Sequence, residues 1–149
     1  MGRSRVAAVS AMAAIVFLSA CSTGSAKGKG PDAEVAFLVD LPEQVKIADE
    51  PVQQAYRFAL IEAELLTDIP CYCGCVAIGH RSNDDCYVSG IGSSGQPEFD
   101  LHALGCGVCV DITHDAILLK NEGKSVAAIQ LAIDQRYSRF GPPTILSPD

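Results

Sequence analysis

Six cysteines between residues 71 and 109 of this 149-residue chain are the side chains best suited to chemistry. They form two groups of three, one with a single residue between neighbours and one that ends in a Cys-x-x-Cys pair: Cys71, Cys73 and Cys75, then Cys86, Cys106 and Cys109. Thiolates at such spacings are the ligands that Cu(I), Zn²⁺ and similar soft ions prefer. One interpretation of the pattern is therefore a metal–thiolate site.

The local geometry expected of each group favours sulfurs that meet at a common point. In an extended segment, residues two apart point to the same side, so the first three sulfurs can converge, and Gly74 lets the backbone curl around them. On a helix, Cys106 and Cys109 would be neighbours on one face near its start, where the helix dipole favours the thiolate.

Two histidines close to the cysteines extend the predicted ligand set. His80 lies five residues after Cys75, and His102 lies four residues before Cys106. The candidate ligands are then eight: Cys71, Cys73, Cys75, His80, Cys86, His102, Cys106 and Cys109. Eight ligands suit two four-coordinate zinc ions or a small thiolate-bridged copper cluster. His114 is left out because it lies about 12 Å further along the helix axis than Cys106.

The hexapeptide Pro70-Cys71-Tyr72-Cys73-Gly74-Cys75 resembles the signature of the PCYCGC-motif lipoproteins. Other residues that fit the same pattern extend the likeness over about residues 50–140: Gly79, His80, Ser82, Asn83, Cys86 and the run Cys106–Cys109. This family has no settled function. The resemblance therefore implies a lipid tether and a cysteine-rich domain, and it implies little about the chemistry.

Disulfides are the main alternative use of the cysteines. Outside the cytoplasm small domains often use disulfides to compensate for thin cores, and six is an even number. Each cysteine of the first group could pair with one of the second, although three bridges leaving alternate residues would crowd one another. A third interpretation is thiol–disulfide exchange at Cys106 and Cys109, but no βαβ pattern surrounds this pair.

The sequence contains no other arrangement that predicts catalysis. It has no Gly-rich phosphate loop, no nucleophile elbow and no His-Glu-x-x-His motif, so we do not expect an enzyme. The formal net charge of −7 argues against nucleic acid and anionic lipid surfaces as ligands. The predicted function is the binding of a soft metal ion, Cu(I) or Zn²⁺. The alternative is a disulfide-stapled lipoprotein that holds an unidentified protein partner.

Three helices are predicted to position the cysteines. Apolar residues recur at three- and four-residue intervals over 49–66, with Pro51 suited to the first turn. A second helix is expected from about Gly107 to Asn121, with Gly123 as its stop signal. A third begins after Ser125 as N-cap and carries an apolar face of Val126, Ile129, Ile133, Tyr137 and Phe140.

The expected fold is a small, mainly α single domain with one long helix, a C-terminal helical hairpin and a long Cys-rich loop between them. The hairpin is antiparallel because the connection between its helices is short. The stretch 76–105 shows neither helical nor strand periodicity, apart from a short strand expected around Cys86–Val88. Long loops of this kind need something other than a hydrophobic core to hold them, and the cysteines are the candidates.

The N-terminus predicts secretion and a lipid anchor. Arg3 and Arg5 precede an uncharged apolar run from Val6 to Phe17, which is the pattern of a signal peptide, and the run is short for a membrane span. Leu-Ser-Ala-Cys at residues 18–21 resembles a lipobox, so we expect cleavage before Cys21 and lipidation of its thiol. Loss of two arginines and no acid would take the net charge from −7 to −9.

The predicted organisation is a signal peptide over 1–20, a lipidated flexible linker over 21–31 and the Cys-rich helical domain over 32–149. The linker is rich in Ser, Thr, Gly and Lys, with nothing to bury. The mature chain would be lipid-anchored to a bacterial membrane on an extracytoplasmic face. It would contain no methionine, since Met1 and Met12 both precede the cleavage site, so the soft ligands available are thiolate and imidazole.

Overall fold

The computed structural model describes residues 39–144. The predicted signal peptide, Cys21 and the linker lie outside the described residues. The elements follow in the order α2 (Glu43–Lys46), α3 (Glu50–Ile61), α4 (Ala63–Thr67), η1 (Cys75–Ile78), η2 (Asp84–Cys86), β1 (Val88–Ile91), β2 (Pro97–Phe99), η3 (His102–Gly105), α5 (Gly107–Asn121) and α6 (Val126–Tyr137), where η marks a 3-10 helix. This part of the chain is mainly helical, as predicted.

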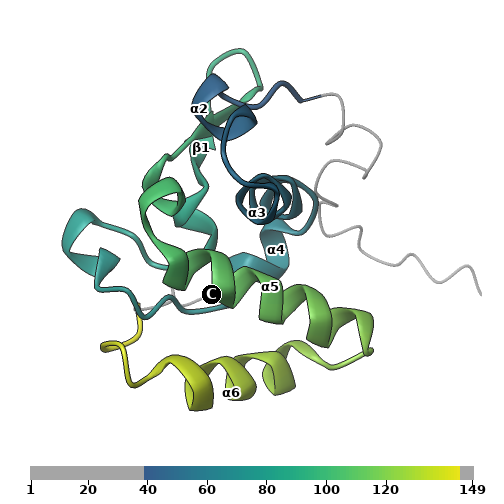
Figure 1. Ribbon diagram of the computed structural model, residues 1–149, viewed down its shortest axis with the longest axis vertical. Helices are drawn as coiled ribbons and strands as arrows, with labels where there is room; N and C mark the ends of the chain where they lie inside the picture. Colours follow the sequence, from purple (N-terminus) through teal and green to yellow (C-terminus); the bar gives the residue numbers. More distant parts are fainter. Residues whose placement is uncertain (1–38, 145–149) are drawn as a thin grey trace, which may run out of the picture.

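Helix α5 is the centre of the fold. It contacts α3 on one side and α6 on the other, and the short β-hairpin lies near its first turn (Figure 1). Its buried side chains include Ile112 and Ala116, which pack in one core with Tyr56 of α3 and Ile133 of α6. Within residues 39–144, no helix combines the length and apolar character that crossing a bilayer requires.

The helical hairpin agrees with its sequence prediction. Helix α5 has the predicted bounds, and Gly123 follows it with φ +76°, the left-handed conformation that ends helices. Ser125 caps α6, since its hydroxyl oxygen accepts a hydrogen bond from the Ala128 N–H at 3.3 Å. The predicted apolar face is only partly buried, because Val126 is 40% exposed and Phe140 is 51% exposed.

The prediction of a single helix over 49–66 is wrong. It is divided into α3 and α4 at Glu62, whose φ of −122° and ψ of +36° lie outside the helical range. The carboxylate of Glu62 forms an ion pair with Lys120 of α5 at 3.1 Å. The break lets Leu65 and Leu66 of α4 enter the core, while Ala55 and Ala59 of α3 remain buried. Apolar periodicity continued through the break and so could not locate it.

The segment predicted as a loop also differs from expectation. It contains three short 3-10 helices and an antiparallel hairpin in which Val88 pairs with Phe99 and Ile91 with Pro97. The strand begins at Val88, whereas Cys86 belongs to the 3-10 helix η2, so the predicted strand was placed too early. A turn with Gly95 at φ +77° connects the strands. These short elements bring residues distant in the sequence to the first turn of α5.

The C-terminal end of the described chain returns to the Cys-rich segment, where the yellow end of the trace in Figure 1 meets the teal loop. The Cys71 N–H donates to the Thr144 hydroxyl oxygen, and the Thr144 N–H donates to the Cys71 carbonyl, both at 2.8 Å. Gly141 lies so close to this segment that an added Cβ would be 3.0 Å from the Tyr72 carbonyl oxygen. These contacts with Gly141 and Thr144 hold the backbone at the start of the cysteine motif independently of its sulfurs.

Candidate metal centre

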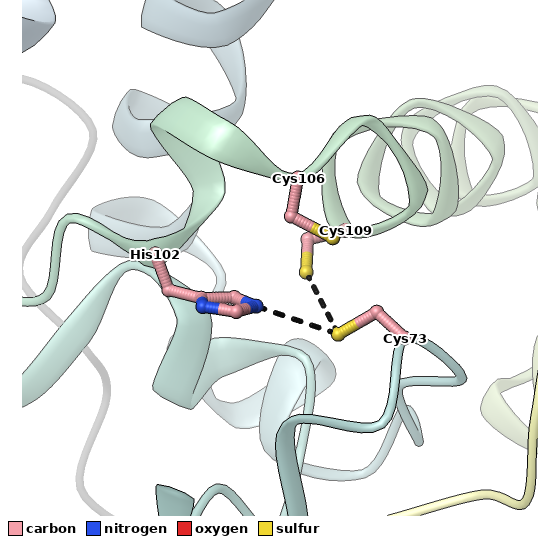
Figure 2. A group of neighbouring side chains, drawn as sticks. All are labelled: Cys73, His102, Cys106 and Cys109. Carbon is pink, nitrogen blue, oxygen red and sulfur yellow. Dashed lines mark hydrogen bonds between the residues drawn. The ribbon is translucent and has the colours of Figure 1, made fainter.

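Four side chains from two separate parts of the chain converge at the first turn of α5. We call them the outer group: Cys73, His102, Cys106 and Cys109, whose ligand atoms all lie within 4.8 Å of one another. Cys106 and Cys109 come from the start of the helix, and Cys73 lies opposite them on the Cys-rich loop (Figure 2). The His102 imidazole points at Cys73, with Nε2 3.5 Å from its sulfur. This group is a set of three sulfurs and one nitrogen around one point.

A second convergence lies deeper in the fold. We call it the inner group: Cys71, Cys75 and Cys86, whose sulfurs also lie within 4.8 Å of one another. All three side chains are buried. His80 adjoins this group, with Nδ1 3.6 Å from the Cys86 sulfur. The inner group is thus three sulfurs with a buried imidazole beside one of them.

The Cys109 sulfur joins the two groups. It lies 3.2 Å from the Cys86 sulfur and 3.5 Å from the Cys71 sulfur, both of the inner group. It also lies 3.6 Å from the Cys73 sulfur of the outer group. The Cys71 and Cys73 sulfurs also approach across the groups, at 3.4 Å. The two groups are therefore one continuous cluster, and Cys109 has the most contacts between them.

The distances between these sulfurs fit metal ligation. Two thiolates bound to one tetrahedral ion at about 2.3 Å are about 3.8 Å apart, close to the 3.2–3.6 Å spacings of the Cys109 sulfur. A disulfide needs about 2.05 Å between sulfurs. All six cysteines of the described chain are free, and none of their sulfur pairs is at bonding distance. The alternative pairing, of the first three cysteines with the last three, is not formed among these residues.

One acidic side chain contacts the ring of His80 and the backbone of His102. The Asp100 carboxylate has one oxygen 3.4 Å from Nε2 of His80, and its other oxygen accepts the His102 backbone N–H at 2.7 Å. The Asp100 carbonyl accepts the Tyr56 hydroxyl at 2.9 Å, which fixes this residue to α3. A carboxylate beside one ring nitrogen leaves the other nitrogen free for a metal. The Asp100 contact therefore aims Nδ1 of His80 at the inner group.

A buried polar network holds Cys109 in place. The Tyr87 hydroxyl donates to the Cys109 carbonyl at 2.9 Å and contacts the Thr113 hydroxyl at 2.7 Å. The Asn83 side-chain amide donates to that same Thr113 oxygen at 2.6 Å. Asn83 and Tyr87 flank η2 and Thr113 belongs to α5, so the network also ties the loop to the helix. Buried hydrogen bonds of this kind restrain the residues that form them.

The environment of the cluster shifts the ionisation of its thiols. Hydrogen bonds from Cys109 and Cys86 hold the pKa of the Cys71 thiol far below its usual value. The pKa of Cys109 is raised in turn, first because it donates to Cys71. Burial and the nearby Cys71 charge raise the pKa of Cys73 and Cys75. The cluster thus holds one thiolate, at Cys71, among thiols that keep their protons, and a soft cation that binds there would displace those protons.

The structure brings together all eight residues predicted as ligands, four in the outer group, three in the inner group and His80 beside it. His114, which the prediction left out, is indeed elsewhere, with Nε2 3.0 Å from the Pro51 carbonyl oxygen. Asp100 was missed. Its position two residues before His102 was the available signal, but sequence alone does not show that it also reaches His80.

The cysteine motif is also what relates this chain to known proteins. Residues 16–147 match the family described as protein of unknown function with PCYCGC motif. The chain belongs to this family. The membership confirms the resemblance drawn from the PCYCGC hexapeptide, and the match reaches beyond residues 50–140 on both sides. Neither a curated protein nor a solved structure matches the chain.

The glycine of the PCYCGC motif makes a direct prediction. Gly74 has φ +83°, and nothing lies within 4 Å of an added Cβ, so Gly74→Ala meets only backbone strain of about 1–2 kcal/mol. We expect this loss in chemical denaturation and a matching loss of metal affinity, because Cys73 and Cys75 flank the strained residue. Gly105→Ala is the matched control, since Gly105 is equally open and has no positive φ. Equal behaviour of the two variants would refute the prediction.

Proposed function

We propose that this protein is an extracytoplasmic, membrane-anchored lipoprotein that binds a soft metal ion, Cu(I) or Zn²⁺, through its Cys/His cluster. One observation carries the proposal. Free cysteines from separate segments place their sulfurs at ligand spacing, with His80 and His102 each within 3.6 Å of a cysteine sulfur. Thiolate and imidazole are the donors that these ions select.

The donor set narrows the class of metal. Sulfur and nitrogen donors disfavour Mg²⁺ and Ca²⁺, which require oxygen ligands. Three sulfurs and one imidazole in the outer group suit tetrahedral Zn²⁺, and three buried sulfurs in the inner group suit Cu(I) or Zn²⁺. Cys109 between the groups suits a thiolate that bridges two ions.

The proposed role is binding, without catalysis. A catalytic zinc keeps one coordination position open for water or substrate. In the outer group, one imidazole and three sulfurs supply four protein ligands, so a tetrahedral ion held there has no open position. Storage, sensing or delivery of the ion at the cell surface are the roles that such closed coordination favours.

The proposed location depends on Cys21, which the sequence places at the end of a signal-peptide pattern. Lipidation of this cysteine would anchor the acidic domain to a bacterial membrane through the linker that the sequence predicts over residues 21–31. Free thiols tend to oxidise to disulfides outside the cytoplasm, and a bound metal slows this oxidation because the thiolates are then coordinated. Metal binding therefore accounts for reduced cysteines outside the cytoplasm.

The deciding experiment combines a free-thiol count in denaturant with the metal content of the full-length protein, purified in detergent from the membrane fraction. We expect six reactive thiols and bound zinc or copper by mass spectrometry. Cys21→Ser is the matched control, because it should move the protein out of the membrane fraction and leave the metal content unchanged.

A different result would identify the alternative. A protein without reactive thiols and without metal, with a mass six hydrogens lower, would contain three disulfides. That outcome would overturn the metal proposal and leave a disulfide-stapled lipoprotein. A Cys21→Ser variant that stays in the membrane fraction would contradict the lipid anchor alone.

A further inference from the structure

The two groups of ligands differ in their access to solvent. In the inner group, Cys71 and Cys86 are 0% exposed and Cys75 is 3% exposed. In the outer group, Cys73, His102 and Cys106 are half-buried, and only Cys109 is fully buried. An ion in the inner group is enclosed by protein, whereas an ion in the outer group faces the surface through three of its ligands.

Glycines keep the surface over the outer group open. Gly74 follows Cys73, and Gly105 and Gly107 lie on either side of Cys106; all three are exposed. A Cβ added to any of them would meet nothing within 4 Å. Cys106 therefore has no side chain on either neighbouring residue to shield it, and Cys73 has none on the residue that follows it, so an incoming ligand can approach their sulfurs.

Cys106 is also the least restrained ligand. The sulfurs of Cys73 and Cys109 each lie within 3.6 Å of other cysteine sulfurs. Among the described residues, no hydrogen bond involves the Cys106 sulfur, and its side chain forms no cap on the helix that it precedes. A ligand that is exposed and weakly restrained is the first to leave the ion.

We infer that the cluster holds a retained ion in the inner group and a transferable ion in the outer group, with Cys109 shared, and that the outer ion is passed to an acceptor thiol. This inference rests on the proposed function and assigns a metal-delivery activity to its accessible half. The acceptor is defined by its chemistry, a thiol on a small molecule or on a protein.

The transfer is a ligand exchange that leaves the oxidation state of the ion unchanged. The acceptor sulfur forms a bond to the ion as the bond from the ion to the Cys106 sulfur breaks. The proton of the acceptor thiol moves to the leaving Cys106 thiolate, so charge and atoms balance. His102 and Cys73 are replaced in the same way by further acceptor ligands. A last acceptor ligand or a water then takes the place of Cys109, whose thiolate stays on the inner ion with Cys71, Cys75 and Cys86.

The test is zinc release from the full-length, zinc-loaded protein in detergent, measured with excess pyridylazoresorcinol, a coloured zinc chelator. We expect about two ions per chain. One should leave at a rate proportional to the chelator concentration, and the other at least about tenfold more slowly, because it requires the fold to open. Cys106→Ser should remove the fast phase only, and Cys75→Ser should remove the slow phase.

Glutathione and a metal-free Cys-x-x-Cys peptide then serve as thiol acceptors, and uptake of the fast ion by either one supports delivery. A fast phase that only glutathione drains assigns delivery to small thiols, whereas one that saturates with the peptide assigns it to a protein partner.

Three outcomes would overturn the inference while the proposed function stands: one ion per chain, two ions released at one rate, or transfer to neither thiol acceptor. A protein that binds no zinc and no copper would instead refute the proposed function itself. The two failures are therefore distinguishable by metal content before any rate is measured.

Discussion

Cys109→Ser is expected to weaken metal binding at both groups by more than about a hundredfold. Loss of a residue that only hydrogen-bonds to a metal ligand already lowers metal affinity by about 10- to 100-fold, and Cys109 is itself a ligand. The Cys109 sulfur is within 3.6 Å of cysteine sulfurs in both groups. Serine keeps the size of the side chain and replaces a soft thiolate with a hydroxyl that soft ions bind poorly. The measurement is competition for Zn²⁺ and for Cu(I) against chelators of known affinity, with metal content per chain.

Cys106→Ser is the matched control for this prediction. It removes a cysteine from the same turn of α5, but the Cys106 sulfur belongs to the outer group alone. We expect the Cys106 variant to keep one ion and the Cys109 variant to keep none under the same competition. Circular dichroism checks that both variants retain their helices. Equal loss of metal in the two variants would show that Cys109 is not shared.

Removal of the metal is expected to lower the stability of the domain substantially. At a free metal concentration a hundredfold above Kd, each bound ion contributes about 2.7 kcal/mol, because the ion binds the folded chain and not the unfolded one. The melting temperature should fall by about 10 °C or more after dialysis against a strong chelator. Calorimetry with and without the chelator, followed by addition of Zn²⁺, measures the loss and its recovery.

The loss should be local before it is global. Residues 71–106 contain seven of the eight ligands and only short elements, so their amide hydrogens should exchange much faster without metal. The hairpin of α5 and α6 should keep its protection, because Ile112, Ile129 and Ile133 are buried without help from an ion. Unchanged melting and unchanged exchange in the metal-free protein would contradict a structural role for the ion.

Local signals in the sequence were sufficient for the helical hairpin. Gly123 and Ser125 set its turn through the left-handed conformation of one and the hydroxyl cap of the other. These effects involve residues close in sequence, so the sequence shows them directly. The division at Glu62 was hidden, because the residue that pairs with Glu62 is Lys120, 58 positions later in the chain.

The ligand types were likewise determined by the sequence. Three cysteines at alternate positions, a Cys-x-x-Cys pair and two nearby histidines predict soft-metal ligands whatever the fold, because coordination depends on donor chemistry and spacing. The PCYCGC hexapeptide also identified the family.

Only the tertiary structure decided how those ligands are shared. The sequence grouped Cys71, Cys73 and Cys75 together, yet the fold assigns Cys73 to the outer group and its two neighbours to the inner group. Cys109 lies between the groups because its sulfur contacts Cys71, 38 positions earlier in the chain. Asp100 contacts His80, 20 positions earlier, as well as the backbone of His102 two residues later. The physical reason is that sequence spacing limits which side chains can meet locally, whereas packing of α5 against the loop selects the pairs that do meet.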